Sequence, residues 1–228
     1  MRYSAAREQS RAQVQQDGSA DVSTKDVVFD LGNVLLRWDP RYLYRKVFAD
    51  EARMERFLAT ACAIDWILSI DGCADFAEPI ADRVQKFPDF ADELRLFDTR
   101  WLETLDGPIE DNLNLLERLK AQNRPVYALT NYPAQKFELS RKVYPFLDTF
   151  DTIVVSGREG VTKPDPRIFE LLFERAGRRP DELFFIDDNA RNIEAARSLG
   201  MDGLLYAPGV NVADELRARG ILPDVCAC

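Results

Sequence analysis

The sequence predicts an α/β protein built on a doubly wound parallel sheet, with a small helical domain inserted into it. Short apolar segments typical of buried parallel strands recur along the chain, and amphipathic helical patterns separate them. After the first apolar segment, one long interval without a strand pattern breaks this alternation. The alternation predicts the sheet, and the interruption predicts the insert.

Five apolar segments are the candidate strands. Each is four to six residues long, and the first ends in a carboxylate at Asp30. Nearly continuous apolar runs of this length are typical of strands covered by helices on both faces. The segments lie at 26–30, 125–130, 152–155, 183–186 and 203–206.

Three stretches between these segments carry a helical pattern. They span residues 111–122, 166–177 and 192–200. Apolar side chains recur three or four positions apart in each, so that one face of the helix would pack on the sheet. Gly200 ends the last stretch, which is a common helix stop.

Residues 36–107 are predicted to form the inserted helical domain. The interval is rich in helix formers and aromatic side chains, and it is far longer than the dozen or so residues that an ordinary crossover needs. We expect most of its aromatic side chains to form its own core. The remaining divisions are a polar N-terminal extension over residues 1–25 and a core domain made of residues 26–35 and 108–228.

The composition excludes several classes of site. The 228 residues include 30 basic and 39 acidic side chains, a net charge of −9, and no histidine. Histidine-dependent catalytic pairs and histidine-ligated metals are therefore excluded. The acidic excess argues against a nucleic-acid partner, since such binding relies on basic patches. No segment reaches the ~20 apolar residues of a membrane span, so no membrane partner is expected.

The cysteine content bears on the cellular compartment. Four cysteines occur, and none is part of a C-x-x-C pair. This number is too small for a disulfide scaffold and fits a reducing compartment. We expect a cytoplasmic protein that is a monomer or a homodimer.

Reactive side chains follow four of the predicted strands. The carboxyl ends of parallel strands meet at one edge of a sheet, where ligands bind in doubly wound folds. We therefore expect these side chains to converge. They are Asp30 after the first strand, Thr130 and Asn131 after the second, Lys163 in the loop after the third, and Asp187 and Asp188 after the fourth.

This set of side chains has the chemistry of a magnesium and phosphate site. Carboxylate oxygens are the hard ligands that Mg²⁺ prefers, and a carboxylate can also act as a nucleophile. The adjacent carboxylates Asp187 and Asp188 would repel each other unless a cation lies between them. A lysine and a metal ion together offset the charge of a transferring phosphoryl group, and the Thr130 hydroxyl and the Asn131 main-chain amide can donate to its oxygens.

Four ordered segments resemble the motifs of the haloacid dehalogenase-like hydrolase superfamily. They are Phe29-Asp30-Leu31-Gly32-Asn33-Val34-Leu35, Leu129-Thr130-Asn131, Lys163-Pro164-Asp165-Pro166 and Phe185-Ile186-Asp187-Asp188-Asn189. The resemblance implies a Rossmann-like core and a helical cap that closes over the site. It also implies that Asp30 is the covalent nucleophile and that Lys163 holds both nucleophile and phosphate. Mg²⁺ would be bound by Asp30, the main-chain carbonyl of Gly32, Asp187 and Asp188.

The resemblance predicts a Mg²⁺-dependent phosphatase that acts on small phosphorylated metabolites through an aspartyl-phosphate. The Gly32-Asn33 form of the first motif is similar to that of sugar-phosphate phosphatases. The predicted catalytic residues are Asp30, Lys163 and Thr130. The predicted contacts to phosphate are Thr130, Asn131, Lys163 and Asn33.

Gly32 departs from the common pattern of these phosphatases. Most of them have an aspartate there, which protonates the leaving group, and a general acid is typically worth about 10²–10⁴ in rate. Its absence predicts a strong dependence of rate on leaving-group pKa, unless another group such as Asp71 or Lys46 of the insert donates the proton. Trp38, Arg41, Trp66 and the Ile70-Asp71-Gly72 turn are candidates for contacts with substrate.

The same set of residues also allows other functions. A 2-haloacid dehalogenase would use Asp30 to attack carbon, but the Asp187–Asp188 pair would repel its carboxylate substrate. A protein that only binds a phosphorylated ligand, or a phospho-switch, is a more remote alternative. Receiver domains of signalling proteins are phospho-switches of this kind. In them the acidic pair comes first in the chain, whereas here it comes last.

Overall fold

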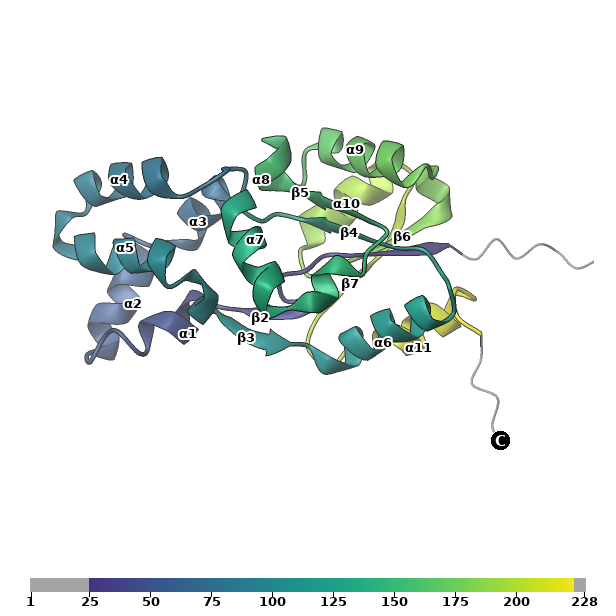
Figure 1. The fold of residues 1–228 in the computed structure, drawn as a ribbon, viewed down its shortest axis with the longest axis horizontal. Helices are drawn as coiled ribbons and strands as arrows, with labels where there is room; N and C mark the ends of the chain where they lie inside the picture. Colours follow the sequence, from purple (N-terminus) through teal and green to yellow (C-terminus); the bar gives the residue numbers. More distant parts are fainter. Residues whose placement is uncertain (1–24, 224–228) are drawn as a thin grey trace, which may run out of the picture.

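The computed structural model describes residues 25–223 and centres on a five-stranded parallel sheet (Figure 1). The strand order is β5-β4-β1-β6-β7, so the first strand lies in the middle. The strands match the five predicted segments to within one residue at each end, which confirms the predicted fold class. They are β1 (Asp26–Phe29), β4 (Val126–Thr130), β5 (Thr152–Val155), β6 (Leu183–Asp187) and β7 (Asp202–Leu205).

Helices cover both faces of this sheet. Successive side chains of a strand point to opposite faces, so Val28 packs with α9 (Pro166–Ala176) and α10 (Ala190–Ser198) in one apolar cluster. Val27 and Phe29 instead join the cluster that contains α6 (Glu110–Ala121) and α11 (Val212–Ala218). The remaining core helices are α7 (Ala134–Val143) and α8 (Ser156–Glu159).

The three predicted core helices are α6, α9 and α10. α10 begins two residues earlier than the pattern indicated, because the Asn189 side chain accepts from the backbone N–H of Arg191 and caps the helix there. At the start of α9, Asp165 caps in the same way and Pro166 occupies the first turn.

Five helices lie between the first strand and α6, on the left in Figure 1. Their aromatic side chains pack on one another: the ring centroids of Phe76 and Phe97 are 5.4 Å apart, and those of Phe97 and Trp101 are 5.3 Å apart. These contacts agree with the expected aromatic core. The helices are α1 (Pro40–Tyr44), α2 (Glu51–Ala59), α3 (Ile64–Ile70), α4 (Ala77–Lys86) and α5 (Ala91–Thr99).

A strand pair that the sequence did not predict connects these helices to the sheet. β2 (Leu36–Trp38) pairs antiparallel with β3 (Leu105–Pro108), whereas the sequence predicts only helices over residues 36–107. Each strand is too short to show a period-two pattern, and β3 ends in Gly107-Pro108. The pairing arises because the two ends of the inserted helical segment leave the core side by side.

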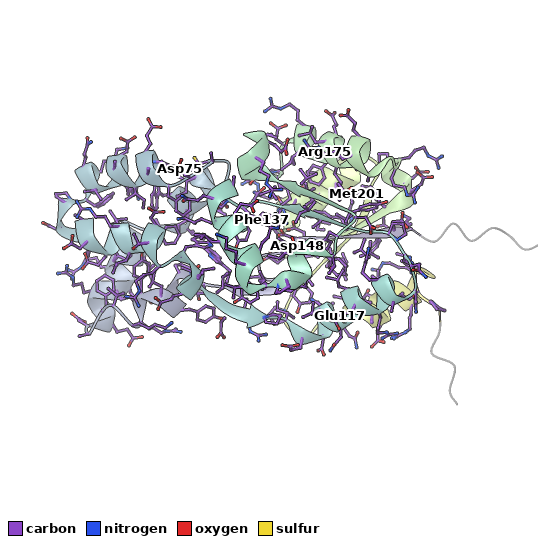
Figure 2. All side chains as sticks on the ribbon, in the orientation of Figure 1. Asp75, Glu117, Phe137, Asp148, Arg175 and Met201 are labelled. Carbon is purple, nitrogen blue, oxygen red and sulfur yellow. The ribbon has the colours of Figure 1, made fainter. Side chains whose placement is uncertain are left out.

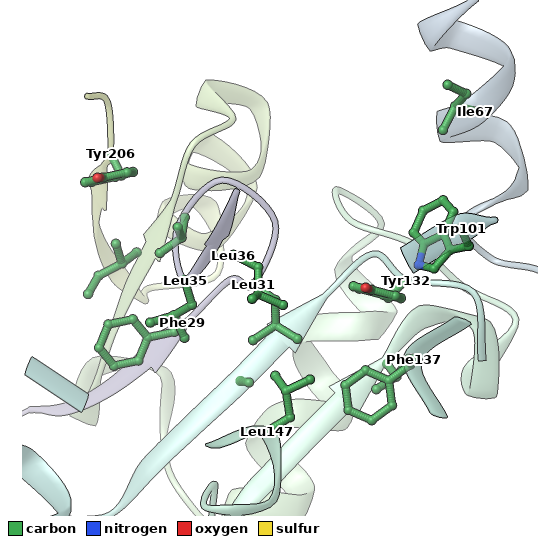
Figure 3. Packing of buried hydrophobic residues seen from close by; sticks show 14 of the residues in the cluster. Phe29, Leu31, Leu35, Leu36, Ile67, Trp101, Tyr132, Phe137, Leu147 and Tyr206 are labelled. Carbon is green, nitrogen blue, oxygen red and sulfur yellow. The ribbon is translucent and has the colours of Figure 1, made fainter. Parts of the chain in front are cut away.

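The apolar core is continuous from the sheet into the helical segment. Figure 3 shows Trp101 beside Tyr132, whose ring centroid is 5.8 Å away, with Phe137 and Leu147 below them. Among residues 25–223, every helix falls short of the length and apolarity that crossing a bilayer requires. Except for Lys25, the predicted N-terminal extension lies outside the described residues, as do Cys226 and Cys228.

Candidate active site

Lys163 lies between two carboxylates at the carboxyl edge of the sheet. Its Nζ is 2.9 Å from Oδ1 of Asp30, which directly follows β1, and 2.7 Å from Oδ2 of Asp187, the last residue of β6. Carboxylate oxygens of Asp30, Asp187 and Asp188 all lie within 4.8 Å of one another. The structure therefore brings together the residues that the sequence placed at separate strand ends.

Asn131 fixes the backbone of Lys163. Its Oδ1 accepts from the Lys163 backbone N–H at 2.7 Å, and its Nδ2 donates to the Lys163 carbonyl at 3.0 Å. The Lys163 ammonium also donates to the carbonyl of Leu129 at 2.9 Å. The end of β4 thus positions the lysine, and the Asn131 side chain is occupied in doing so.

Asp187 is held by donors from the start of α10. Its carboxylate accepts from the backbone N–H of Asn189 at 2.7 Å and from Nδ2 of Asn192 at 3.0 Å. Together with the bond from Lys163 this occupies both oxygens of the fully buried carboxylate. Sequence reasoning missed Asn192; the only signal was its position one helical turn after the Asp187-Asp188-Asn189 segment.

The pKa values of the site residues are shifted because these charged groups lie close together and are poorly solvated. Burial raises the pKa of Asp30 to about 7, with Lys163 opposing this and Asp187 and Asp188 adding to it. Although burial opposes it, the charges of Asp187 and Asp30 raise the pKa of Lys163, so the ammonium stays protonated. Burial and the neighbouring Asp187 also raise the pKa of Asp188. Three carboxylates around one ammonium leave an excess of negative charge that a further cation would offset.

The donor set fits a hard divalent cation. Asp30 and Asp188 line a cleft, and their oxygens, with those of Asp187, are the ligand type that Mg²⁺ takes. Gly32 also lines this cleft, and a Cβ placed on it would meet nothing within 4 Å. No sulfur or imidazole ligand lies in this cluster of described residues, which argues against a soft metal.

Thr130 and Asn33, which the sequence predicts to contact phosphate, lie in different environments. The hydroxyl of Thr130 is buried and has no hydrogen-bond partner among residues 25–223. Asn33 has a left-handed backbone with φ 53°, and its Oδ1 accepts from the backbone N–H of Trp38 at 3.0 Å. Asn33 also lines the cleft, and its side chain partly opposes the rise that burial causes in the pKa of Asp188.

The cleft has a volume of about 390 Å³ and lies between the sheet edge and the inserted helices. Of the insert residues considered from sequence, Trp38 and Asp71 line it. Arg41, Trp66, Ile70 and Gly72 do not, and Lys46 forms an ion pair with Glu103 at 3.1 Å instead. The sequence alone offered no way to separate these two groups, because the difference depends on how the elements of the insert pack against the core.

A turn of the insert is tied directly to the core beside this cleft. The Ser156 hydroxyl donates to the Asp71 carbonyl at 2.6 Å and accepts from the Tyr132 backbone N–H at 2.8 Å. The backbone N–H groups of Ala134 and Gln135, at the start of α7, donate to the carbonyls of Cys73 and Ala74. These bonds hold the end of α3 against the carboxyl edge of the sheet.

Comparison with known proteins gives a consistent family. The family model described as hydrolase, haloacid dehalogenase-like hydrolase, matches residues 24–200. The sesquiterpene phosphatase astK of Aspergillus oryzae is 36% identical over 104 residues, which are 46% of this chain and 53% of that protein. The chain therefore spans about half the length of that relative.

Two longer matches extend the likeness to most of the chain. Flavin mononucleotide hydrolase 1 of Arabidopsis thaliana is 27% identical over 205 residues, covering 86% of this chain and 77% of that protein. A haloacid dehalogenase family enzyme of Bacteroides thetaiotaomicron, solved as a variant in complex with magnesium and inorganic phosphate, superposes with a TM-score of 0.64. It is 25% identical, and the match covers 84% of this chain and 98% of that one.

Proposed function

The chain belongs to the family of haloacid dehalogenase-like hydrolases, and from this premise we propose that it is a Mg²⁺-dependent phosphatase of small phosphate monoesters. The observation that carries the proposal is the position of Lys163 between Asp30 and Asp187, with Asp188 beside them. This arrangement has one nucleophile, one fixed cation and further carboxylates in excess of that cation. It suits transfer of a phosphoryl group to a carboxylate.

Asp30 is the proposed nucleophile. Its carboxylate oxygen attacks phosphorus, the bond from phosphorus to the leaving oxygen breaks, and water then hydrolyses the aspartyl-phosphate. Lys163 keeps the nucleophile oriented and offsets charge on the phosphoryl oxygens. The unpartnered Thr130 hydroxyl, Asn33 and the main-chain N–H of Asn131 are the proposed further contacts to phosphate.

Mg²⁺ would be held by Asp30, Asp187, Asp188 and the main-chain carbonyl of Gly32. The ion supplies positive charge that stabilises the phosphoryl oxygens and favours the ionised form of Asp30. Because the Asp187 carboxylate already accepts from Lys163, Asn189 and Asn192, Asp188 is the ligand of the pair that is freer to bind it. Asp187 then acts mainly by holding Lys163 in place.

The helical insert, residues 36–107, is the proposed cap, and residues 26–35 and 108–228 are the proposed core domain. Trp38 and Asp71 of the insert line the same cleft as Asp30, so the insert contributes part of the substrate site. The names of the two curated relatives refer to a sesquiterpene and to flavin mononucleotide. They support a phosphorylated organic substrate.

The dehalogenase alternative is disfavoured by the charge of the cleft. A 2-haloacid carries a carboxylate that would have to bind beside Asp30 and Asp188, while the one lysine that lines the cleft is already paired with two carboxylates. Like charges at this distance oppose binding.

The test is a release assay with purified full-length protein. We expect inorganic phosphate from p-nitrophenyl phosphate and from small alkyl phosphates with Mg²⁺, and none in excess chelator. Full activity in chelator would refute the metal assignment. Chelator-insensitive halide release from a 2-haloacid, without phosphatase activity, would establish the dehalogenase function instead.

A further inference from the structure

The inserted helices present an almost entirely apolar wall to the cleft. The cleft-lining residues from the insert are one carboxylic acid, Asp71, and six large apolar side chains. The six are Leu36, Trp38, Ile64, Leu68, Trp101 and Leu105. The insert contributes no lysine, arginine, serine, threonine, asparagine or glutamine to this lining. Apart from Asp71, its polar side-chain atoms there are the indole nitrogens of Trp38 and Trp101, both buried and without a hydrogen-bond partner among residues 25–223. The polar lining comes from the core, where the carboxylates and Lys163 lie.

Two of these apolar side chains are exposed although they are large. Ile64 is 50% exposed and Leu68 is 47% exposed, and they are two of only four large hydrophobic residues with high exposure among residues 25–223. Both belong to α3 and lie four positions apart, so they project from one face of that helix. Both line the cleft, so this face of α3 offers accessible hydrocarbon surface to a ligand whose phosphate lies at the charged core residues.

We infer that the substrate is the phosphate monoester of an apolar alcohol, whose hydrocarbon part lies against the α3 side of the cleft. This inference rests on the proposed phosphatase function and narrows its substrate class. The phosphate end meets the charged core residues, and the cleft of about 390 Å³ continues from them to the apolar wall. A polyol would bring several hydroxyls to a wall that offers them few partners, and an unpaired polar group is costly to desolvate.

The test is a series of phosphates with matched leaving groups. Ethyl, butyl and hexyl phosphate and glucose 6-phosphate all release a primary alcohol, so chemistry varies little among them. We expect kcat/KM to rise about three- to fourfold per added methylene until the cleft is filled, and glucose 6-phosphate to lie near or below ethyl phosphate. A flat alkyl series, or a preference for the sugar phosphate, would overturn the substrate class and leave the phosphatase intact. Absence of phosphate release even from p-nitrophenyl phosphate would overturn both.

A matched pair of variants locates the binding surface. Leu68→Asn should flatten the chain-length series. Val143→Asn alters a side chain of similar exposure, 51%, at the end of α7, outside the cleft. It should leave the series as in the natural protein. Equal effects of the two variants would refute the assignment of α3 as the binding wall.

A separate observation concerns Asp71, the one acid among the cleft-lining residues of the insert. Its side chain is largely buried, and within residues 25–223 no group donates a hydrogen bond to its carboxyl. Its backbone carbonyl accepts from Ser156, which holds the residue at the carboxyl edge of the sheet, and Asp71 lines the cleft together with Asp30. Burial raises the pKa of Asp71 well above its usual range, Asp30 adds to this and Lys163 opposes it.

We propose that Asp71 protonates the leaving alcohol, the function that Gly32 cannot perform. As Asp30 attacks, the phosphorus–oxygen bond to the alcohol breaks, the electron pair stays on that oxygen, and the Asp71 proton moves to it. In the second step the Asp71 carboxylate takes a proton from the water that attacks phosphorus. Phosphate is released, Asp30 returns to its carboxylate form, and Asp71 is again protonated.

The test compares leaving groups in Asp71→Asn. We expect kcat/KM on butyl phosphate to fall by about 10²–10⁴, whereas p-nitrophenyl phosphate and acetyl phosphate, whose leaving groups need little protonation, should lose less than tenfold. Asp75→Asn is the control. Asp75, labelled in Figure 2, lies near the start of α4 and outside the cleft lining. Its Oδ1 accepts from the backbone N–H of Ala77, and the side-chain oxygen of asparagine can accept in the same way. An equal loss on all three substrates would overturn the role. A steep dependence of the natural protein on leaving-group pKa would do the same, even if Asp71→Asn does not fold.

Discussion

Lys163 and Asp30 form a buried ion pair, with Nζ 2.9 Å from Oδ1, and the same ammonium lies 2.7 Å from Asp187. The lysine is thus the fixed positive charge of a site that contains three carboxylates. Removing one member of a buried pair leaves the other charge without compensation, which costs far more than losing a surface pair. The consequences differ for each member of the cluster.

Replacing Lys163 by methionine should remove activity and destabilise the metal-free protein. Two buried carboxylates would lose their partner, so the free energy of unfolding should fall by about 3–5 kcal/mol in urea titrations. Lys46→Met is the control, because the ion pair of Lys46 with Glu103 is on the surface and little change is expected. Equal stability of the two variants would show that Lys163 does not neutralise the cluster.

Asp30→Asn should abolish turnover while the fold is retained. An amide cannot replace the carboxylate that forms the covalent intermediate. Burial already disfavours the charged form of Asp30, and in the variant Lys163 keeps Asp187 as its partner. The neutral amide should therefore not lower the Tm of the metal-free protein. Circular dichroism checks the fold, and a beryllium fluoride adduct should form with Mg²⁺ on the natural protein and not on the variant. Natural turnover in a folded Asp30→Asn would exclude this residue as nucleophile.

Asp187 and Asp188 should respond differently to the same substitution. Asp188→Asn should reduce the rise in Tm that Mg²⁺ causes. In the natural protein, Mg²⁺ at a hundredfold excess over Kd should stabilise the fold by about 2.7 kcal/mol. The metal-free Tm of Asp188→Asn should be unchanged or higher. Asp187→Asn should lower the metal-free Tm as well, because its carboxylate accepts from Lys163, Asn189 and Asn192. An undiminished Mg²⁺ shift in Asp188→Asn would remove this residue from the metal site.

The sheet and the charged residues at its edge were predictable because local pattern determines both. An apolar run that ends in Asp30, or in Asp187 and Asp188, is complete within a few residues, and parallel strands bring such ends together. β2 and the cleft wall were not predictable in this way. The pairing of Trp38 with Leu105 joins residues far apart in the chain, and no local pattern distinguishes a cleft-lining Leu68 from a residue of the insert core.

Gly157 should be irreplaceable at the contact between insert and core. A Cβ there would lie 2.8 Å from the Tyr132 carbonyl and closer still to backbone atoms of Ala134 and Cys73. Backbone cannot move aside as a flexible side chain can, so Gly157→Ala should cost about 1–3 kcal/mol of stability. The stability control is Gly32→Ala, where the new Cβ meets nothing within 4 Å. If Gly157→Ala were as stable as Gly32→Ala, the docking of the Cys73–Ala74 turn would be looser than the hydrogen bonds indicate.

Gly32→Asp provides a rescue test of the proton donor. The open space at Gly32 and its backbone, which is outside the left-handed region, should accept an aspartate that faces the cleft. If Asp71 donates the proton, Gly32→Asp should change the rate on butyl phosphate little in the natural protein, where a donor is already present. In the Asp71→Asn background the same change should raise the rate on butyl phosphate at least tenfold, because a new acid then faces the leaving oxygen.

Gly32→Asn in the Asp71→Asn background has nearly the same size as the aspartate but no acidic proton, and should restore nothing. If Gly32→Asp raised the rate on butyl phosphate as much in the natural protein as in Asp71→Asn, the natural site would have no proton donor. The rate would then depend on leaving-group pKa, as the missing aspartate at position 32 predicts when the first motif is considered alone.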